Sequence, residues 1–302
     1  MALDRETYRD LVGIGWMLAT GLCFVAVNGI VRGLNGVLPA PESAFLRFLF
    51  GLVVLIPVVV PALRRGFSPQ VWKLFCIRGV LHVIAVIAWF YAMSRITVAE
   101  VTAIGFLNPI IVTIGAAIFM GERLSVRRTL AVMIALCGAL IVLRPGVRAL
   151  DPGHLSQVLA AVAFGASYLV AKRITEEVPP AVVVAMMSVT VSIGLAPIAF
   201  AVWVPPTLGQ LGWLALVAFF ATLGHYTMTR AFAAAPLTVT QPVTFLQLIW
   251  ASLLGVLVFH EPIDPWVIMG GAVMIGAISY ITWREARIRA RTKIPAPGAT
   301  NT

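Results

Sequence analysis

Polar and aromatic side chains recur inside stretches of the chain that are otherwise apolar. Phe24 and Asn28, or His82 and Trp89, are spaced so that both members of a pair fall on one face of a helix. Because a polar side chain in lipid is costly, such a face is expected to point into the interior of a helical bundle. Donors and acceptors gathered there could bind a small polar molecule. The predicted cavity residues are Phe24, Asn28, His82, Trp89, Phe106, Asn108, Tyr168, His225, Tyr226, Gln241, Thr244, Gln247 and Trp250.

Each of these residues also has a structural explanation. Hydroxyl and amide side chains hydrogen-bond between helices in membranes, so a single one is more often a packing contact than a ligand. We favour this explanation for threonines such as Thr20 and Thr222, whereas the bulkier side chains that form stripes fit either explanation. Trp89 and Trp250 are more typical of packing than of an aromatic clamp.

Two arginines, Arg47 and Arg78, fall within the apolar stretches. Arg47 lies near the outer end of its stretch, at about the depth of Glu42 and Glu100. A pair between Arg47 and Glu100, or Glu42, is therefore predicted as a gate. Arg78 lies near the inner end of its stretch, where a long side chain is expected to extend its charge to the membrane surface.

Acidic residues are missing from the middle of every apolar stretch, since all twelve fall at helix ends, in loops or in the tail. A proton-driven antiporter usually needs a titratable group near the midplane, and only His82 and His225 remain as candidates. We therefore expect a facilitative or weakly coupled carrier of neutral or zwitterionic cargo. The three cysteines show no CxxC spacing, which predicts core thiols and no metal or cofactor. No P-loop sequence occurs, so ATP is not the expected driver.

A membrane enzyme is the rival interpretation. The sequence Gly165-Ala166-Ser167-Tyr168 faintly resembles the loop of an intramembrane serine protease, with His225 as a base. A nucleophile needs its base beside it in a water-filled cavity, which nothing in the sequence indicates. We therefore predict no enzymatic activity.

The composition requires lipid as the solvent for much of the surface. Hydrophobic residues make up 60% of the 302 positions and charged residues 11%, and the mean hydropathy is +0.98. A soluble chain of this length could not bury so much apolar surface. The first stretch lacks a cleavage site and is expected to be retained as a helix. Ten helices of near-spanning length are predicted, at about residues 11–31, 43–63, 74–94, 97–120, 129–143, 156–172, 181–203, 211–231, 237–259 and 266–283.

The distribution of basic residues predicts which side each loop faces. With a cytoplasmic N-terminus, the inner segments carry 16 of the 22 Lys and Arg residues, and the outer segments carry 4. Cytoplasmic loops of membrane proteins are enriched in these residues, so both termini are predicted to be cytoplasmic. The basic tail is expected to contact anionic lipid headgroups and no nucleic acid.

The two halves of the chain repeat each other. Residues 92–122 align without a gap with residues 231–261, at an offset of 139, and residues 13–39 align with 153–179 at an offset of 140. This co-linearity indicates an internal duplication. Because each half holds an odd number of helices, the second half must enter the membrane from the opposite side. Inverted repeats of this kind are typical of secondary transporters, which work by alternating access.

The repeat also relates residues that could matter for transport. Glu122 and Glu261 correspond and sit between helices, where we expect them to accept backbone amide hydrogens or to pair with a basic neighbour. Pro109 interrupts the predicted fourth helix and Pro242 the ninth. Interrupted helices in both halves are a common sign of a transport site, although either proline could simply kink its helix.

Several motifs resemble the EamA family of the drug/metabolite transporter superfamily. They are Arg47-Phe48, Phe106-Leu107-Asn108-Pro109, Gly121-Glu122 and Leu143-Arg144-Pro145-Gly146, with a looser match at His260-Glu261. The resemblance covers residues 10–284. It implies an all-α membrane protein of ten transmembrane helices, arranged as two inverted five-helix repeats around a central cavity. The expected divisions are a first repeat over 1–148, a second over 149–284 and a basic cytoplasmic tail over 285–302.

Within this family the layout is similar to that of bacterial amino acid and metabolite exporters. It implies export of amino acids, aromatic or other neutral ones included, and of related small metabolites across the bacterial inner membrane. The alternative is uptake or exchange of another metabolite, such as a nucleoside-like, S-adenosylmethionine-like or vitamin cargo. The implied partners are a small-molecule substrate and the lipid bilayer, and we expect a monomer.

Overall fold

The chain folds into a bundle of α-helices. The computed structural model describes residues 5–34, 37–120, 126–147, 149–174, 177–234, 243 and 246–292, and these form no β-strand. The all-helical prediction is therefore confirmed for this part of the chain. Its helices are α1 (Arg5–Gly33), α2 (Ala40–Arg65), α3 (Pro69–Arg95), α4 (Val98–Gly105), α5 (Leu107–Met120), α6 (Val126–Leu143), α7 (Pro152–Ile174), α8 (Pro180–Ala201), α9 (Leu208–Ala234), α11 (Leu246–Phe259) and α12 (Pro265–Thr292).

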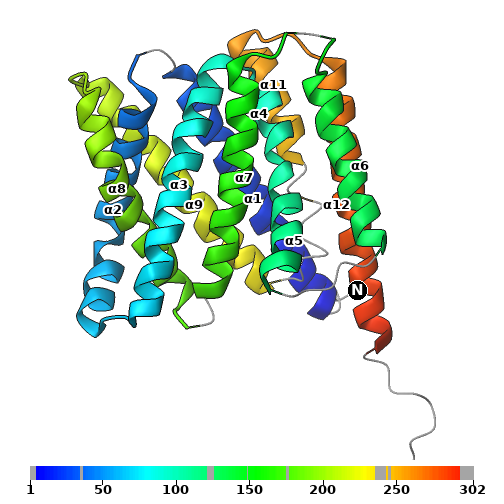
Figure 1. Ribbon diagram of the computed structural model, residues 1–302, viewed down its shortest axis with the longest axis horizontal. Helices are drawn as coiled ribbons and strands as arrows, with labels where there is room; N and C mark the ends of the chain where they lie inside the picture. The colour runs from blue at the N-terminus through cyan, green and yellow to red at the C-terminus, as the bar shows by residue number, and fades with distance from the viewer. Residues whose placement is uncertain are drawn as a thin grey trace, which may run out of the picture.

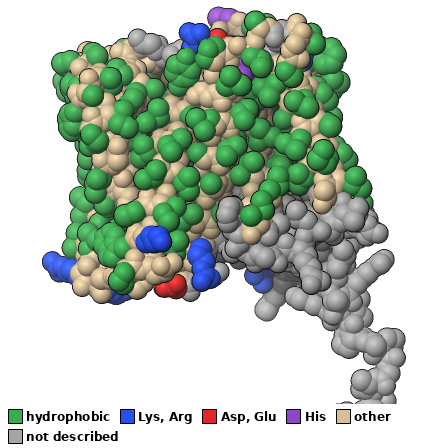
Figure 2. All heavy atoms as spheres, viewed as in Figure 1, with side chains coloured by type: hydrophobic (Ala, Val, Ile, Leu, Met, Phe, Trp, Pro, Cys, Tyr) green, Lys and Arg blue, Asp and Glu red, His purple; other side chains and the backbone are tan. Residues whose placement is uncertain are grey.

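The surface of the bundle suits a lipid environment. Among the described residues, six helices are long and apolar enough to cross a bilayer, and α6, α11 and α12 contain shorter apolar segments. Figure 2 shows hydrophobic side chains over the middle of one face, with Lys and Arg towards its two ends. Val54 and Ile193 are 65% and 68% exposed, which is favourable in contact with lipid tails and unfavourable in water.

Local sequence signals set several of the helix ends. Gly66, with φ 73°, ends α2, because only glycine takes a left-handed conformation without strain. Ser68 accepts a hydrogen bond from the third backbone amide of α3, and Pro69 begins that helix, where its missing N–H is harmless. Thr97 and Glu100 form a reciprocal capping box at the start of α4.

The predicted fourth helix is interrupted in its middle. α4 ends at Gly105, Phe106 forms a turn, and α5 begins at the next residue. Pro109 explains the position, because a proline has no N–H for the carbonyl four residues earlier, which belongs to Gly105. The break therefore falls three residues before the proline that causes it. In the second half, Pro242 lies outside the described residues, and α11 begins at Leu246.

Helices of the first half pack mainly against helices of the second. α1 lies along α9, α3 along α7, α2 along α8 and α6 along α12. The repeat matches α1 with α7 and α3 with α9. The pair α1 and α9 in one half-to-half contact therefore corresponds to the pair α7 and α3 in the other. The ends of α1 and α3 meet the start of α7, since Arg32 donates to the Met93 carbonyl and Arg95 pairs with Asp151. Matching helices α1 and α7 thus run in opposite directions (Figure 1).

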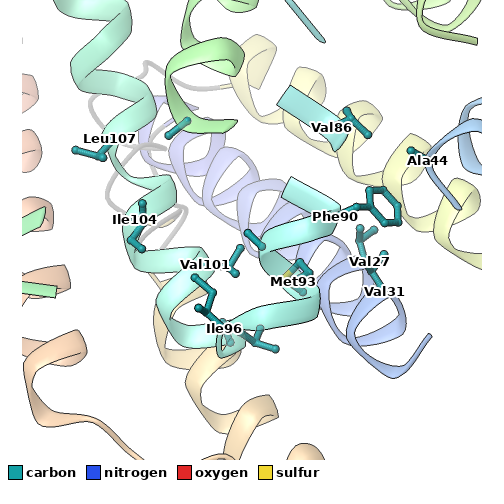
Figure 3. Packing of buried hydrophobic residues seen from close by; sticks show 14 of the residues in the cluster. Val27, Val31, Ala44, Val86, Phe90, Met93, Ile96, Val101, Ile104 and Leu107 are labelled. Carbon is teal, nitrogen blue, oxygen red and sulfur yellow. The ribbon is translucent and has the colours of Figure 1, made fainter. Parts of the chain in front are cut away.

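One part of the apolar core lies where α1, α3 and α4 converge. Figure 3 shows Phe90 of α3 beside Val27 and Val31 of α1, with Val101 and Ile104 on α4, and all five are buried. This packing fixes the inner faces of the three helices relative to one another. The polar residues on the same faces are therefore held at defined positions around the space between the halves.

Candidate functional site

A cavity of about 290 Å³ lies between the two halves of the bundle. Helices α1 to α5 line it from the first half, and α7, α9 and α11 line it from the second. Its volume is close to the lower end of the range for small-molecule sites, about 300 Å³. The predicted cavity residues that line it are Phe24, Asn28, His82, Trp89, Phe106, Asn108, Tyr168, His225 and Gln247.

The remaining predicted cavity residues are not placed in this cavity. Tyr226 is exposed on α9, where its hydroxyl accepts a hydrogen bond from Arg230 and its ring contacts Trp16. Trp250 is exposed on α11 and does not line the cavity. Gln241 and Thr244 lie outside the described residues. A helical stripe predicts a shared face, but the rotation of the helix in the bundle decides which members of the stripe point inwards.

The internal repeat relates part of the lining of one half to part of the lining of the other. At the offsets of 139 and 140 found in the sequence, residues that correspond between the halves both line it. These pairs are Phe24 and Phe164, Asn28 and Tyr168, Asn108 and Gln247, and Val86 and His225. The cavity therefore sits where the two halves meet on equivalent faces.

Sequence reasoning missed other lining residues, notably Gln157 and Phe164. The repeat could have identified Phe164, because it corresponds to the predicted Phe24. Gln157 had no such signal, because its repeat equivalent is the apolar Met17. Its Nε2 donates to the Val101 carbonyl at 3.0 Å, whereas its Oε1 is buried without a hydrogen-bond partner.

His82 is enclosed by aromatic rings and a hydroxyl. Its ring centroid lies 5.8 Å from that of Phe48 and 5.0 Å from that of Phe164, both edge to face. Its Nδ1 lies 3.2 Å from the Oγ of Ser167, which is fully buried. Because a catalytic serine must reach its substrate, a hydroxyl with no exposed surface does not suit the protease interpretation.

Arg47 lies on the cavity rather than beside the acidic residues proposed as its gate partners. Glu42 accepts the backbone amide of Val204 at 2.9 Å, and Glu100 contacts His154 at 3.1 Å. The guanidinium of Arg47 instead lies 4.4 Å from the ring centroid of Phe48. No contact among the described residues joins Arg47 to Glu42 or Glu100, whose carboxylates have partners at helix ends, so the gate stays a prediction.

A second cavity, of about 390 Å³, adjoins the first between α2, α8 and α9. Arg47 and His225 line both cavities. Most other residues around the second cavity are apolar, among them Leu55, Val184 and Met187. We call the first cavity, which has more polar side chains in its lining, the polar chamber, and the second the apolar chamber. The two chambers meet at Arg47 and His225.

Arg78 does not extend to the membrane surface, contrary to the prediction. It is buried on α3, donates to the Val183 carbonyl at 2.8 Å and contacts the sulfur of Met187 at 3.2 Å. The packing of α8 against α3 brings these acceptors within reach, and the position of α8 was not readable from the sequence around Arg78.

Ion pairs join the two halves at one end of the bundle. Glu261 lies 2.8 Å from Arg32 of α1 and also accepts the backbone amide of Val98, at the start of α4, at 3.0 Å. An acidic side chain at a helix N-terminus accepts a hydrogen bond from a free backbone amide and interacts favourably with the positive end of the helix dipole. Glu261 thus has the amide and basic partners expected of it, and its counterpart Glu122 lies outside the described residues.

Three further contacts between the halves lie at the same end. Arg144 pairs with Asp264, Arg95 pairs with Asp151 at 3.2 Å, and His154 contacts Glu100. Asp151 lies between helices, and its hydrogen bond from the Gly153 amide, together with Arg95, lowers its pKa below the ordinary value. These contacts hold the halves together at the end of the bundle where α1 and α3 terminate.

Three proteins of similar sequence are described as transporters. A riboflavin transporter of Rhizobium johnstonii is 30% identical, with 95% of this chain and 96% of that protein aligned. An S-adenosylmethionine uptake transporter of Rickettsia bellii is 26% identical over 93% of this chain and 96% of its own. The pseudopaline exporter CntI of Pseudomonas aeruginosa is 26% identical over 89% and 95%.

A solved crystal structure shares the fold. It superposes with a TM-score of 0.60 at 20% identity, covering 94% of this chain and 99% of the other. The model of the EamA-like transporter family matches the chain twice, at residues 11–144 and 151–283. The two matches span nearly all of the described bundle and both sides of the central cavity. This protein therefore belongs to the EamA-like transporter family, whose members cross the membrane several times.

Proposed function

We propose that this protein carries amino acids and related small metabolites out of the bacterial cell through the cavity between its two halves. The observation that carries the proposal is the cavity lined by repeat-equivalent residues, such as Asn28 with Tyr168 and Asn108 with Gln247. Amide, hydroxyl and imidazole groups inside an apolar bundle suit a small cargo with both donors and acceptors. The aromatic rings of Phe24 and Phe164 suit an apolar side chain on that cargo.

The halves act as inverted repeats in this proposal, over residues 1–148 and 149–284, with residues 285–302 as a basic cytoplasmic tail. The antiparallel course of α1 and α7 and the exchangeable packing of helix pairs support the inversion. The excess of Lys and Arg in alternate loops supports cytoplasmic termini and ten spans in the inner membrane of a bacterial cell. A single chain encloses the cavity, so a monomer suffices for transport.

Alternating access would work by opening and closing the end of the bundle at which the ion pairs lie. The contacts of Glu261 and Glu100 cross from one half to the other, so rocking the halves apart must break them.

The described lining of the cavity contains no Asp or Glu. We therefore propose facilitative transport, in which His82 and His225 carry no coupled proton.

Proteoliposomes loaded with labelled amino acids, with and without a pH gradient, test cargo and coupling together. We expect efflux of one or more neutral amino acids at similar rates under both conditions. The His82→Gln, His225→Gln double variant should leave the response to the gradient unchanged. Strong gradient-driven transport that disappears in the double variant would show that the histidines couple protons and would refute the facilitative proposal.

Uptake of an S-adenosylmethionine-like or vitamin cargo is the second candidate. It is favoured by the names of two relatives, an S-adenosylmethionine uptake transporter and a riboflavin transporter. Labelled S-adenosylmethionine and riboflavin therefore belong in the same flux assay. Retention of every amino acid together with passage of either compound would replace the first proposal with the second.

The orientation can be tested by labelling single cysteines from outside intact cells. A cysteine at Ala149 or Pro206 should react with a membrane-impermeant maleimide, and one at Gln70 should not. Gln70 is preferable to Gly66 at the end of α2, where φ 73° would strain a cysteine. The opposite pattern of labelling would reverse the proposed topology.

A further inference from the structure

Arg47 is a cation inside the bundle that lacks a counter-ion within the described residues. Its Nε is buried without a hydrogen-bond partner, and its guanidinium contacts the face of the Phe48 ring. The Nε atoms of Arg78 and Arg144 also lack a partner, but another nitrogen of each of these guanidinium groups has one. Arg144 pairs with Asp264, and Arg78 donates to the Val183 carbonyl. Arg32 pairs with Glu261. A charge without a counter-ion inside an apolar bundle is costly, so a partner that arrives from outside the chain would relieve this cost.

The second half has no arginine at the position equivalent to Arg47. At the offset of 140, which aligns the prolines before α2 and α8, its equivalent is Met187. Both residues line the apolar chamber, and only Arg47 of the two also lines the polar chamber. The fold therefore accepts an uncharged side chain at this position, and the arginine adds a property that the packing of the repeat does not require.

Two more buried polar atoms without partners belong to the lining of the polar chamber. They are Oδ1 of Asn108 and Oε1 of Gln157, both hydrogen-bond acceptors. Buried polar atoms nearly always have partners, so such atoms around a cavity indicate a ligand or water that completes them. Together the chamber offers one cationic fork for an anion and acceptors for donor groups.

We propose that Arg47 binds an anionic carboxylate of the cargo at the junction of the two chambers, while Asn108 and Gln157 accept hydrogen bonds from its donor groups. This proposal rests on the proposed transport function and specifies its cargo as a carboxylate that also carries donor groups, such as an amino acid. Guanidinium is suited to this role because its planar fork matches a carboxylate with two parallel hydrogen bonds. The apolar chamber beyond Arg47 would take the apolar part of the cargo.

The test compares each amino acid with its carboxamide, which keeps shape and amino group and removes the negative charge. Unlabelled L-phenylalanine and L-methionine, or their amides, compete against counterflow of labelled L-phenylalanine in proteoliposomes. The same compounds are assayed in detergent for their effect on the thermal unfolding midpoint. For the wild type, we expect the acids to compete and to stabilise about 10- to 100-fold more effectively than the amides, as for loss of a charged hydrogen bond.

Variants separate the role of Arg47 from general effects of charge. Arg47→Gln should lose the preference for the acid, and Arg47→Lys should keep part of it, because the charge remains and the fork is lost. Arg95→Gln is the matched control, since it removes an arginine that pairs outside the cavity with Asp151, and it should keep the wild-type preference for the acid. If Arg47→Gln does not fold, the Arg47→Lys variant and the wild-type ratio of acid to amide still test whether Arg47 binds a carboxylate.

The possible outcomes distinguish the two proposals. Equal action of acids and amides on the wild type, or an acid preference unchanged in Arg47→Gln, overturns the anion subsite and leaves transport standing. Stabilisation by chloride, lost in Arg47→Gln, without any effect of the amino acids would identify an inorganic anion as the occupant and overturn the carboxylate. Acid-selective stabilisation without amino acid flux supports the subsite and overturns amino acid export.

Discussion

Removal of the Glu261 carboxylate should weaken the closed end of the bundle. In the structure the side chains of Glu261 and Arg32 are 9% and 19% exposed, and they lie 2.8 Å apart. The second carboxylate oxygen accepts the amide of Val98 at 3.0 Å. One side chain of the second half therefore holds both the end of α1 and the start of α4, which belong to the first half.

The size of the effect follows from these two contacts. Breaking a fully buried ion pair by removing one partner costs about 3–5 kcal/mol. The loss here should lie at or below the lower end of that range, because Arg32 is 19% exposed and keeps its hydrogen bond to the Met93 carbonyl. The Val98 amide would lose its hydrogen bond as well, a loss of about 1–3 kcal/mol if water does not replace it. If opening already breaks both contacts, Glu261→Ala destabilises only the closed form. A change of about 3 kcal/mol is a shift of at least about a hundredfold in the ratio of open to closed molecules.

The assay is the rate of maleimide labelling at a cysteine that replaces Val101, a buried residue of the cavity lining. The exposed native cysteines are removed, and the buried Cys23 is kept as a reporter of unfolding. We expect Glu261→Ala to speed labelling from the outer side strongly, with Cys23 unreactive. Gly255→Ala should act in the same direction, because a Cβ there would lie 2.6 Å from the Glu261 carboxylate.

The matched control is Asp151→Asn, which removes a pair that crosses between the halves at the same end but is largely open to solvent. Water and salt screen such a pair, so its loss should change labelling little. Equal labelling rates for the Glu261→Ala and Asp151→Asn variants would refute the assignment of closure to the buried pair. Rapid labelling of Cys23 would show instead that Glu261 supports the fold as a whole.

Two other substitutions test the packing and the cavity. Gly138→Ala should lower the free energy of unfolding by about 1–3 kcal/mol, because its Cβ would lie 2.7 Å from the Gly270 carbonyl oxygen. Gly276→Ala should leave the free energy of unfolding unchanged, because a Cβ there would have nothing within 4 Å. Thermal unfolding in detergent measures both variants. Tyr168→Ala or Gln247→Ala should lower transport without lowering abundance in the membrane, as measured by flux and immunoblot of the same vesicles. Normal transport by both would assign these residues to packing.

The sequence by itself determined the class of the protein and most of its helices. Apolar stretches of spanning length can only be satisfied in lipid as helices, so the approximate bounds of many helices follow from hydropathy. The duplication is visible because both halves keep the same order of residues, such as Phe24 with Phe164. The same regularity predicted that polar faces from both halves would surround one cavity, and many of the predicted residues do line one space.

The tertiary structure decided which side chain meets which. Arg78 is held by a carbonyl of α8, and Arg47 stands on the cavity without Glu100, because rotation and depth of neighbouring helices set these distances. Tyr226 belongs to a polar stripe yet lines the adjoining second cavity and not the central one, for the same reason. Periodicity along one helix specifies a face only relative to that helix. The partner of that face depends on packing between segments far apart in the chain, which no local pattern of residues contains.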